Sequence, residues 1–176
     1  MLTFLVGGAR SGKSALAVDL GRRHVGPVCF VATCPALDDD LAARIARHRA
    51  SRPDWPTVEE PIELASAIDG AGEALVIVDC LTLWVSNLML RGDGDDNVIA
   101  AARGVAAAAS QRPAPTVIVS NEVGMGVHPE HELGRRYRDL LGATNRLVAA
   151  EATTTLLLVA GRALRLDDAS TLLERS

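Results

Sequence analysis

The stretch Leu2-Thr3-Phe4-Leu5-Val6-Gly7-Gly8-Ala9-Arg10-Ser11-Gly12-Lys13-Ser14 decides the fold, because its second part is a complete G-x-x-x-x-G-K-[ST] phosphate-binding loop. The mostly apolar residues before the loop predict a short buried strand, and Ser14–Arg23 predicts a helix directly after it. In this arrangement the N–H groups of the loop and the helix N-terminus surround the phosphates of a nucleotide. A glycine-rich turn without a ligand is the alternative interpretation of the same residues.

Lys13 is the only lysine among the 18 lysine and arginine residues of the chain. A compact ammonium on a flexible stem reaches the β- and γ-phosphates of a nucleotide, whereas a planar guanidinium does not suit that position. The Ser14 hydroxyl is predicted to hold Mg²⁺, the cofactor that accompanies the triphosphate. We therefore predict a nucleoside triphosphate site in which Lys13 is a catalytic residue.

Length and composition limit the class of protein. A chain of 176 residues is long enough for a full hydrophobic core, and we expect residues 1–176 to form a single nucleotide-binding domain. The net charge of −4 and the sequence pI of about 5.5 argue against general nucleic-acid or membrane-surface binding. The sequence shows no signal-peptide pattern and no apolar stretch that could span a bilayer, so a cytoplasmic location is expected. Three cysteines without a C-x-x-C pair predict neither a disulfide framework nor a zinc site.

Short aliphatic runs alternate with helical patterns along the chain, which predicts an α/β protein with a mostly parallel sheet of the P-loop NTPase type and helices on both faces. The expected strands are Leu2–Val6, Val28–Thr33, Leu75–Asp79, Thr116–Ser120 and Thr154–Val159, with a weaker indication at Thr57–Glu59. The expected helices are Ser14–Arg23, Asp38–Arg49, Pro61–Ile68, Leu81–Leu90, Asn97–Gln111 and Glu130–Ala150. We expect loops at Arg91–Asp96 and Arg112–Pro115, and a short helix or a frayed tail at Arg162–Ser176.

Asp79 is the first polar candidate at a strand end, where ligands of such sheets bind. Leu75-Val76-Ile77-Val78-Asp79 has four aliphatic residues followed by an acid, the Walker B pattern, in which the aspartate holds Mg²⁺ beside the loop serine. Asp79 also precedes the predicted helix Leu81–Leu90, so it is alternatively an N-cap residue. The two roles are compatible, and the metal role is preferred.

A second candidate strand end is Asn121-Glu122-Val123-Gly124-Met125-Gly126, which follows another predicted buried strand. An amide and a carboxylate at such a position, followed by a loop with two glycines, are typical of groups that face a ligand. A turn whose glycines supply unusual backbone dihedrals is the alternative. The candidate substrate-binding residues are Asn121, Glu122, Gly124 and Gly126.

The segment Leu37–Pro53 begins with aspartates and ends with arginines, which matches the dipole of a helix at both ends. Arg44 and His48 are four residues apart and share one face of that helix. On these residues alone, a solvated amphipathic helix is the simpler interpretation. Arginines can nevertheless bind a polyphosphate, and a neutral histidine can attack phosphorus.

Taken together, these motifs resemble one known family. The matching residues are Gly7–Ser14, Ala32-Thr33, Asp38–Ile45 with His48, Arg52-Pro53 and Asn121–Gly126. In this order and spacing they resemble the bifunctional adenosylcobinamide kinase/adenosylcobinamide-phosphate guanylyltransferase family of cobalamin biosynthesis. The resemblance extends to about Gly161.

The resemblance implies two reactions and their site residues. A nucleoside triphosphate phosphorylates adenosylcobinamide, and a histidine, here His48, then attacks the α-phosphorus of GTP and passes GMP to adenosylcobinamide phosphate. The implied substrates are therefore GTP, ATP, adenosylcobinamide and its phosphate, and the implied assembly is a homo-oligomer such as a trimer. The implied nucleotide contacts are Gly7, Gly8, Ala9, Arg10, Ser11, Gly12, Lys13, Ser14, Ala32, Thr33, Cys34, Arg49, Ala50, Ser51, Arg52, Glu59 and Asp79.

Three positions depart from the family pattern, and two rival functions are left open. Some members carry two adjacent histidines where this chain has Arg47 and His48, and relatives can have serine and glutamate at Cys34 and Asp79. The first rival is a monofunctional P-loop small-molecule kinase without a covalent nucleotide intermediate. The second is a nucleotide-driven switch or assembly ATPase. The sequence does not indicate whether ATP or GTP supplies the kinase step.

Overall fold

The computed structural model of the chain describes residues 1–34, 49–50 and 52–173. Its centre is a seven-stranded sheet in the order β3-β2-β4-β5-β1-β6-β7. All neighbouring strands are parallel except β6 and β7, which are antiparallel. The strands are β1 Leu2–Gly7, β2 Val28–Ala32, β3 Thr57–Glu59, β4 Leu75–Asp79, β5 Thr116–Val119, β6 Thr154–Val159 and β7 Arg162–Leu166. The predicted mostly parallel sheet is confirmed.

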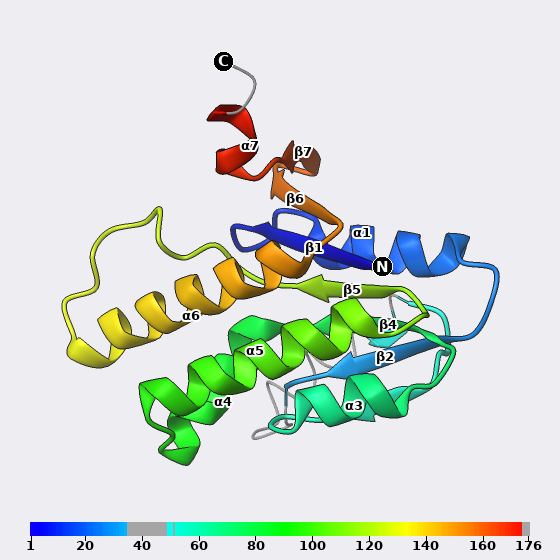
Figure 1. The fold of residues 1–176 in the computed structure, drawn as a ribbon, viewed down its shortest axis with the longest axis horizontal. Helices are drawn as coiled ribbons and strands as arrows, with labels where there is room; N and C mark the ends of the chain where they lie inside the picture. The colour runs from blue at the N-terminus through cyan, green and yellow to red at the C-terminus, as the bar shows by residue number, and fades with distance from the viewer. Residues whose placement is uncertain (35–48, 51, 174–176) are drawn as a thin grey trace.

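Helices cover both faces of this sheet, as predicted (Figure 1). On one face α3, α5 and α6 lie side by side, and α4 packs against the same buried core. On the opposite face, α1 packs on β1, β4 and β5. The helices are α1 Lys13–Arg23, α3 Leu64–Gly70, α4 Leu81–Arg91, α5 Asp95–Gln111, α6 Glu132–Glu151 and α7 Ala169–Leu173.

The two cores follow from the alternation of side chains along each strand. In β1, Phe4 and Val6 join the core under α3–α6, while Leu5 between them joins the core under α1. Burial on both faces explains why the strands are continuous aliphatic runs without polar alternation. Among the described residues, none of the helices is both long and apolar enough to cross a membrane.

The C-terminal part of the chain is where the sequence-based expectation was wrong. Arg162–Leu166 is strand β7, which pairs with β6 through Val159 and Arg162, and only Ala169–Leu173 forms a short helix. Ala160 and Gly161, with φ of 49° and 73°, form the two-residue turn between the strands. Two consecutive residues with positive φ match the right-handed twist of a hairpin, so the chain returns as an edge strand.

Two helix starts also differ from the expected ones. Helix α3 begins at Leu64 instead of Pro61, because Glu60 Oε1 accepts hydrogen bonds from the N–H groups of Ile62 and Glu63 and so forms a turn there. Helix α5 begins at Asp95, inside the expected loop, where the two acidic residues of its first turn complement the helix dipole. The expected helix Asp38–Arg49 lies, except for Arg49, outside the described residues.

Candidate nucleotide-binding site

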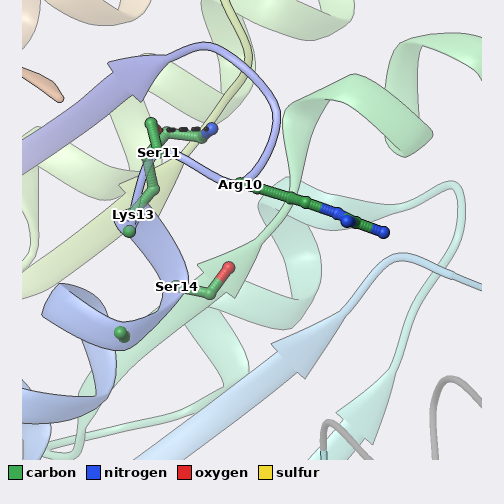
Figure 2. A pocket seen from close by; sticks show the side chains of 6 residues that line it. Arg10, Ser11, Lys13 and Ser14 are labelled. Atoms are coloured by element: carbon green, nitrogen blue, oxygen red, sulfur yellow. Dashed lines mark hydrogen bonds between the residues drawn. The ribbon is translucent and has the colours of Figure 1, made fainter. Parts of the chain in front are cut away.

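The loop between β1 and α1 has the backbone conformation of a phosphate cradle. Gly7, Arg10 and Gly12 all have positive φ, and Gly12 is the N-cap residue of α1. A side chain at Gly7 would collide with the carbonyl oxygen of Leu158, so the close packing of the loop on β6 requires glycine there. Residues 10–15 line a cavity of about 240 Å³ beside the helix N-terminus (Figure 2). The backbone dipoles of this cavity favour an anion.

Lys13 is turned into the loop, and Figure 2 shows it joined to Ser11 while Arg10 extends away from it. Its ammonium donates hydrogen bonds to the carbonyl oxygens of Gly7 and Gly8, at 2.9 and 2.7 Å, and the side chain is buried. Burial lowers the pKa of Lys13, and the nearby Cys80 and Asp79 partly oppose that shift. The cation is therefore already held at the base of the loop.

Asp79 ends β4 at the same edge of the sheet as the loop. Its carboxylate influences the pKa of Lys13, so it lies within electrostatic range of the loop. The N-cap residue of α4 is Cys80 and not Asp79, so the capping interpretation of Asp79 is wrong. The Asp79 carboxylate and the Ser14 hydroxyl are both hard oxygen donors of the type that Mg²⁺ prefers. By the chemistry of their donor atoms, these two residues fit the predicted metal and would hold it.

No group of three or more His, Cys, Asp or Glu side chains is arranged to hold a metal within the described ranges. Burial, with Asp79 beside it, raises the pKa of the Cys80 thiol to about 11. Cys80 therefore stays a neutral thiol near pH 7 and is a poor metal ligand there.

Thr33 joins the end of β2 to the start of α4. Its hydroxyl donates to the carbonyl oxygen of Cys80 at 2.7 Å and accepts from the Cys80 N–H at 2.9 Å. The amide of Asn87 donates to the carbonyl oxygens of Thr33 and Pro61, at 2.7 and 3.2 Å. Thr33 is fully buried, so its side chain fixes the strand ends and does not face solvent.

We expect Thr33→Val to lower the free energy of unfolding by about 2 kcal/mol, because it leaves the buried Cys80 N–H without its acceptor. Equilibrium urea unfolding measures this change. The matched control is Thr144→Val, since the Thr144 hydroxyl is buried without a hydrogen-bond partner in the described part of the chain. Its replacement should be neutral or stabilising, and equal losses from both variants would contradict the role given to Thr33.

Arg52 lies beside β2 and β3. Its guanidinium stacks on the Phe30 ring at 3.9 Å and donates to the Thr57 hydroxyl at 3.0 Å. Burial and the neighbouring Arg49 lower the pKa of Arg52, while Asp79 acts in the opposite direction. Arg52 Nε is buried and has no hydrogen-bond partner among the described residues, so it retains a donor. Arg49 and Ala50 are exposed beside it.

The end of β5 contacts the phosphate-binding loop. The Glu122 N–H donates to the carbonyl oxygen of Gly7 at 3.1 Å. The Asn121 N–H donates to the Thr82 hydroxyl at 3.0 Å, and its carbonyl accepts from the Asn145 amide at 3.0 Å. Gly124 and Gly126 are exposed in the loop that follows.

The structure thus gathers most sequence-predicted site residues at the carboxyl edge of the sheet. Ala32 is the last residue of β2, Thr33 and Cys34 follow it, and Glu59 is exposed at the end of β3. His48 and Ser51 lie outside the described residues. Sequence reasoning missed Thr82, Asn87 and Asn145, which support the strand ends from α4 and α6. No local pattern marks them, because each acts through a contact distant in sequence.

The fold and the site define the chain as an α/β protein of the P-loop nucleotide-binding class. The model of the family described as cobinamide kinase / cobinamide phosphate guanyltransferase matches residues 3–166. The chain belongs to that family, and the family predicted from the motifs is confirmed.

Curated relatives agree with this assignment. The chain is 40% identical over 169 residues to the bifunctional adenosylcobalamin biosynthesis protein CobP of Pseudomonas aeruginosa, with 92% of this chain and 94% of that protein covered. It is 38% identical to the bifunctional adenosylcobalamin biosynthesis proteins CobU of Escherichia coli K12 and of Salmonella typhimurium. Those alignments cover 92% of this chain and 97% of each relative.

Among solved structures, an ATPase from the type III secretion system of pathogenic bacteria is similar in fold. The TM-score is 0.59 at 12% identity, and the match covers 99% of this chain and 53% of that chain. At this identity the likeness concerns the α/β fold alone, so it gives no support to the assembly-ATPase alternative.

Proposed function

We propose that this protein phosphorylates adenosylcobinamide with a nucleoside triphosphate and then transfers GMP from GTP to the product, giving adenosylcobinamide-GDP. Membership of the cobinamide kinase / cobinamide phosphate guanyltransferase family carries the proposal. The bifunctional relatives align over nearly their whole length, which supports both activities in one chain. We also propose that residues 1–176 act as a single nucleotide-binding domain.

In the kinase step, the loop residues Gly7–Ser14 hold the triphosphate at the N-terminus of α1. Lys13 is available to exchange its bonds with the Gly7 and Gly8 carbonyls for bonds to phosphate oxygens. Bound between Ser14 and Asp79, Mg²⁺ would neutralise charge that develops on the transferred group. Arg10 extends from the loop as a further cation for the nucleotide.

In the guanylyl step, His48 attacks the α-phosphorus of GTP, pyrophosphate leaves, and GMP is carried as a phosphoramidate. The phosphate of the phosphorylated cobinamide then displaces the histidine. A covalent intermediate divides one difficult displacement into two easier ones. Arg49 and Arg52 follow this histidine in sequence, and Arg52 Nε, which has no hydrogen-bond partner among the described residues, supports a phosphate-binding role for Arg52. The proposed nucleotide contacts also include Ala32, Cys34, Ala50, Ser51 and Glu59. Thr33, which the sequence also predicted as a contact, is fully buried and instead supports this strand end through its bonds to Cys80.

The test is to incubate the purified protein with Mg²⁺, adenosylcobinamide and either ATP or GTP, and to analyse both protein and corrinoid by mass spectrometry. We expect a phosphorylated corrinoid, an acid-labile GMP adduct on the protein with GTP, and adenosylcobinamide-GDP. Phosphorylated corrinoid without adduct or GDP product would favour the monofunctional kinase instead. Nucleotide hydrolysis without any corrinoid product would refute both activities.

The loop after β5 is the proposed contact for the bulky corrinoid, through Asn121, Glu122, Gly124 and Gly126. A side chain at Gly126 would meet only the Val123 carbonyl oxygen, at 4.0 Å, so the fold tolerates one. We therefore expect Gly126→Val to raise the KM for adenosylcobinamide and to leave GTP affinity unchanged. Steady-state kinetics and GTP titration measure the two effects, with Gly104→Val, on α5, as the control. Equal losses of corrinoid and GTP binding would contradict this placement.

We further propose that the protein forms a homo-oligomer, such as a trimer. The support is an edge strand, β7, whose residues are all exposed and which carries Leu164 at 63% exposure, while Val159 at the end of the neighbouring strand β6 is 61% exposed. Apolar side chains on an unpaired edge are typical of an interface. Light scattering of the eluting protein measures its mass in solution.

A further inference from the structure

Glu122 follows a strand that lies between the phosphate-binding loop and Asp79, the two parts of the chain proposed to hold the nucleotide and its metal. Strand β5 lies between β1, which leads into the phosphate-binding loop, and β4, which ends in Asp79. The carboxyl end of β5 is therefore flanked by the phosphate-binding loop and by Asp79. Glu122 lies three residues after the last residue of β5. Figure 1 shows the chain leaving β5 at this edge before it reaches α6.

A shared hydrogen-bond acceptor brings Glu122 next to Lys13. The carbonyl oxygen of Gly7 accepts both the Lys13 ammonium, at 2.9 Å, and the Glu122 N–H, at 3.1 Å. The lysine of such a loop reaches the β- and γ-phosphates. A residue that contacts the same carbonyl oxygen is therefore close to the place where the γ-phosphoryl group would be transferred.

The backbone at Glu122 is fixed from three elements. Ser120 donates to the Asn145 side-chain oxygen at 2.6 Å, and Asn145 in turn donates to the Asn121 carbonyl at 3.0 Å. Thr82 of α4 accepts the Asn121 N–H at 3.0 Å. Ser120 and Asn145 are buried, so this network holds the strand end in one position.

The carboxylate of Glu122 lies at the start of the exposed loop. Its Oε1 accepts a hydrogen bond from the Gly124 N–H at 2.5 Å, and the side chain is only partly buried. Beyond it, Met125 and Val127 are 81% and 96% exposed. The Glu122 carboxylate thus lies in a partly exposed position at the start of an exposed loop.

We propose that Glu122 is the general base of the kinase step, an inference that rests on the proposed function. Its carboxylate takes the proton from the aminopropanol hydroxyl of adenosylcobinamide as that oxygen bonds to the γ-phosphorus. The bond from the γ-phosphorus to the β,γ-bridging oxygen breaks, and the nucleoside diphosphate leaves with the electron pair. The proton then passes from Glu122 to solvent.

Other acidic groups at this edge are less suited to the role. Asp79 is assigned to Mg²⁺, and a carboxylate that holds a metal is a weaker proton acceptor. Glu59 ends β3, which is separated from β5 by β2 and β4.

The experiment compares wild type with Glu122→Gln, Glu122→Asp and the control Glu130→Gln, which removes a carboxylate from the exposed far part of the same loop. Transfer of labelled γ-phosphate to adenosylcobinamide measures the kinase step, and GMP-adduct formation with GTP measures the guanylyl site. For Glu122→Gln we expect the kinase kcat to fall about 100-fold or more. The nucleotide KM and the rate of adduct formation should stay at wild-type values, Glu122→Asp should recover part of the rate, and Glu130→Gln should match wild type.

Three results would overturn the inference, and they are distinguishable. Wild-type kinase activity in Glu122→Gln would refute Glu122 as the base while leaving the proposed function intact. A parallel loss of adduct formation in Glu122→Gln would show that Glu122 supports the nucleotide site instead of taking the proton. A wild-type protein that phosphorylates no adenosylcobinamide would refute the proposed function and the inference together.

Discussion

Replacing His48 with alanine is expected to abolish the acid-labile GMP adduct and to lower guanylyl transfer by on the order of 10⁴-fold or more, as the loss of a covalent nucleophile does in other enzymes. The physical reason is that no phosphoramidate can form, so the two-step route is lost. The kinase step, for which we propose Lys13, Ser14 and Asp79, should keep its wild-type rate. Intact mass with GTP and labelled-phosphate transfer measure the two activities separately.

The separation of the two activities is the decisive part of this prediction. His131→Ala is the matched control, because His131 is an exposed residue at the N-terminus of α6 and has no proposed role. That variant should form the adduct like wild type. A His48→Ala protein that still forms an acid-labile GMP adduct would show that another side chain is the nucleophile.

Lys13→Met is expected to impair both reactions instead of one. The ammonium is buried at the base of the loop, and the lysine of such a motif reaches the β- and γ-phosphates. In the proposed kinase reaction the γ-phosphoryl group is transferred, and in the proposed guanylyl reaction the β- and γ-phosphates leave together as pyrophosphate. Removing a preorganised cation or donor of this kind costs about 10²–10³ in kcat. Steady-state kinetics of phosphoryl transfer and of adduct formation, on the same preparation, measure the effect.

Lys13→Arg is the informative companion variant. It keeps the positive charge but replaces a compact ammonium with a planar guanidinium, which cannot occupy the same enclosed position between the Gly7 and Gly8 carbonyls. We expect it to recover little activity. Full activity in Lys13→Arg would mean that charge alone is sufficient, and unimpaired adduct formation in Lys13→Met would restrict the lysine to the kinase step.

Much of the fold was predictable because its strands are buried on both faces. Leu75–Asp79 and Thr154–Val159 were predicted with their observed bounds, since a continuous aliphatic run between polar turns has few other stable arrangements. Strand β7 was missed because it is exposed along its whole length, and its two arginines interrupt the aliphatic run that marks the buried strands. The local feature that creates this strand is the Ala160-Gly161 turn, in which both residues have positive φ. Glycine at 161 is consistent with such a turn, but alanine at 160 does not indicate one.

The candidate site was predictable where one short motif contains the chemistry. Gly7–Ser14 supplies strand, loop, cation and helix N-terminus within a few residues, and Asp79 follows an equally clear run. The supports of the site were not predictable in this way. Asn145 reaches Asn121 across 24 positions, and Asn87 reaches Thr33 across 54, so no local spacing relates them.

By itself, the sequence determined the class of the protein, its nucleotide loop and its family, because these depend on local backbone conformation and on motifs that bind phosphate through adjacent groups. Only the tertiary structure decided that Glu122 shares the Gly7 carbonyl oxygen with Lys13, that Thr33 is buried against Cys80, and that Cys80 caps α4 in place of Asp79. The reason is physical. Strand order sets which chain segments end side by side, and strand order is fixed by the packing of the whole sheet, which no single segment encodes.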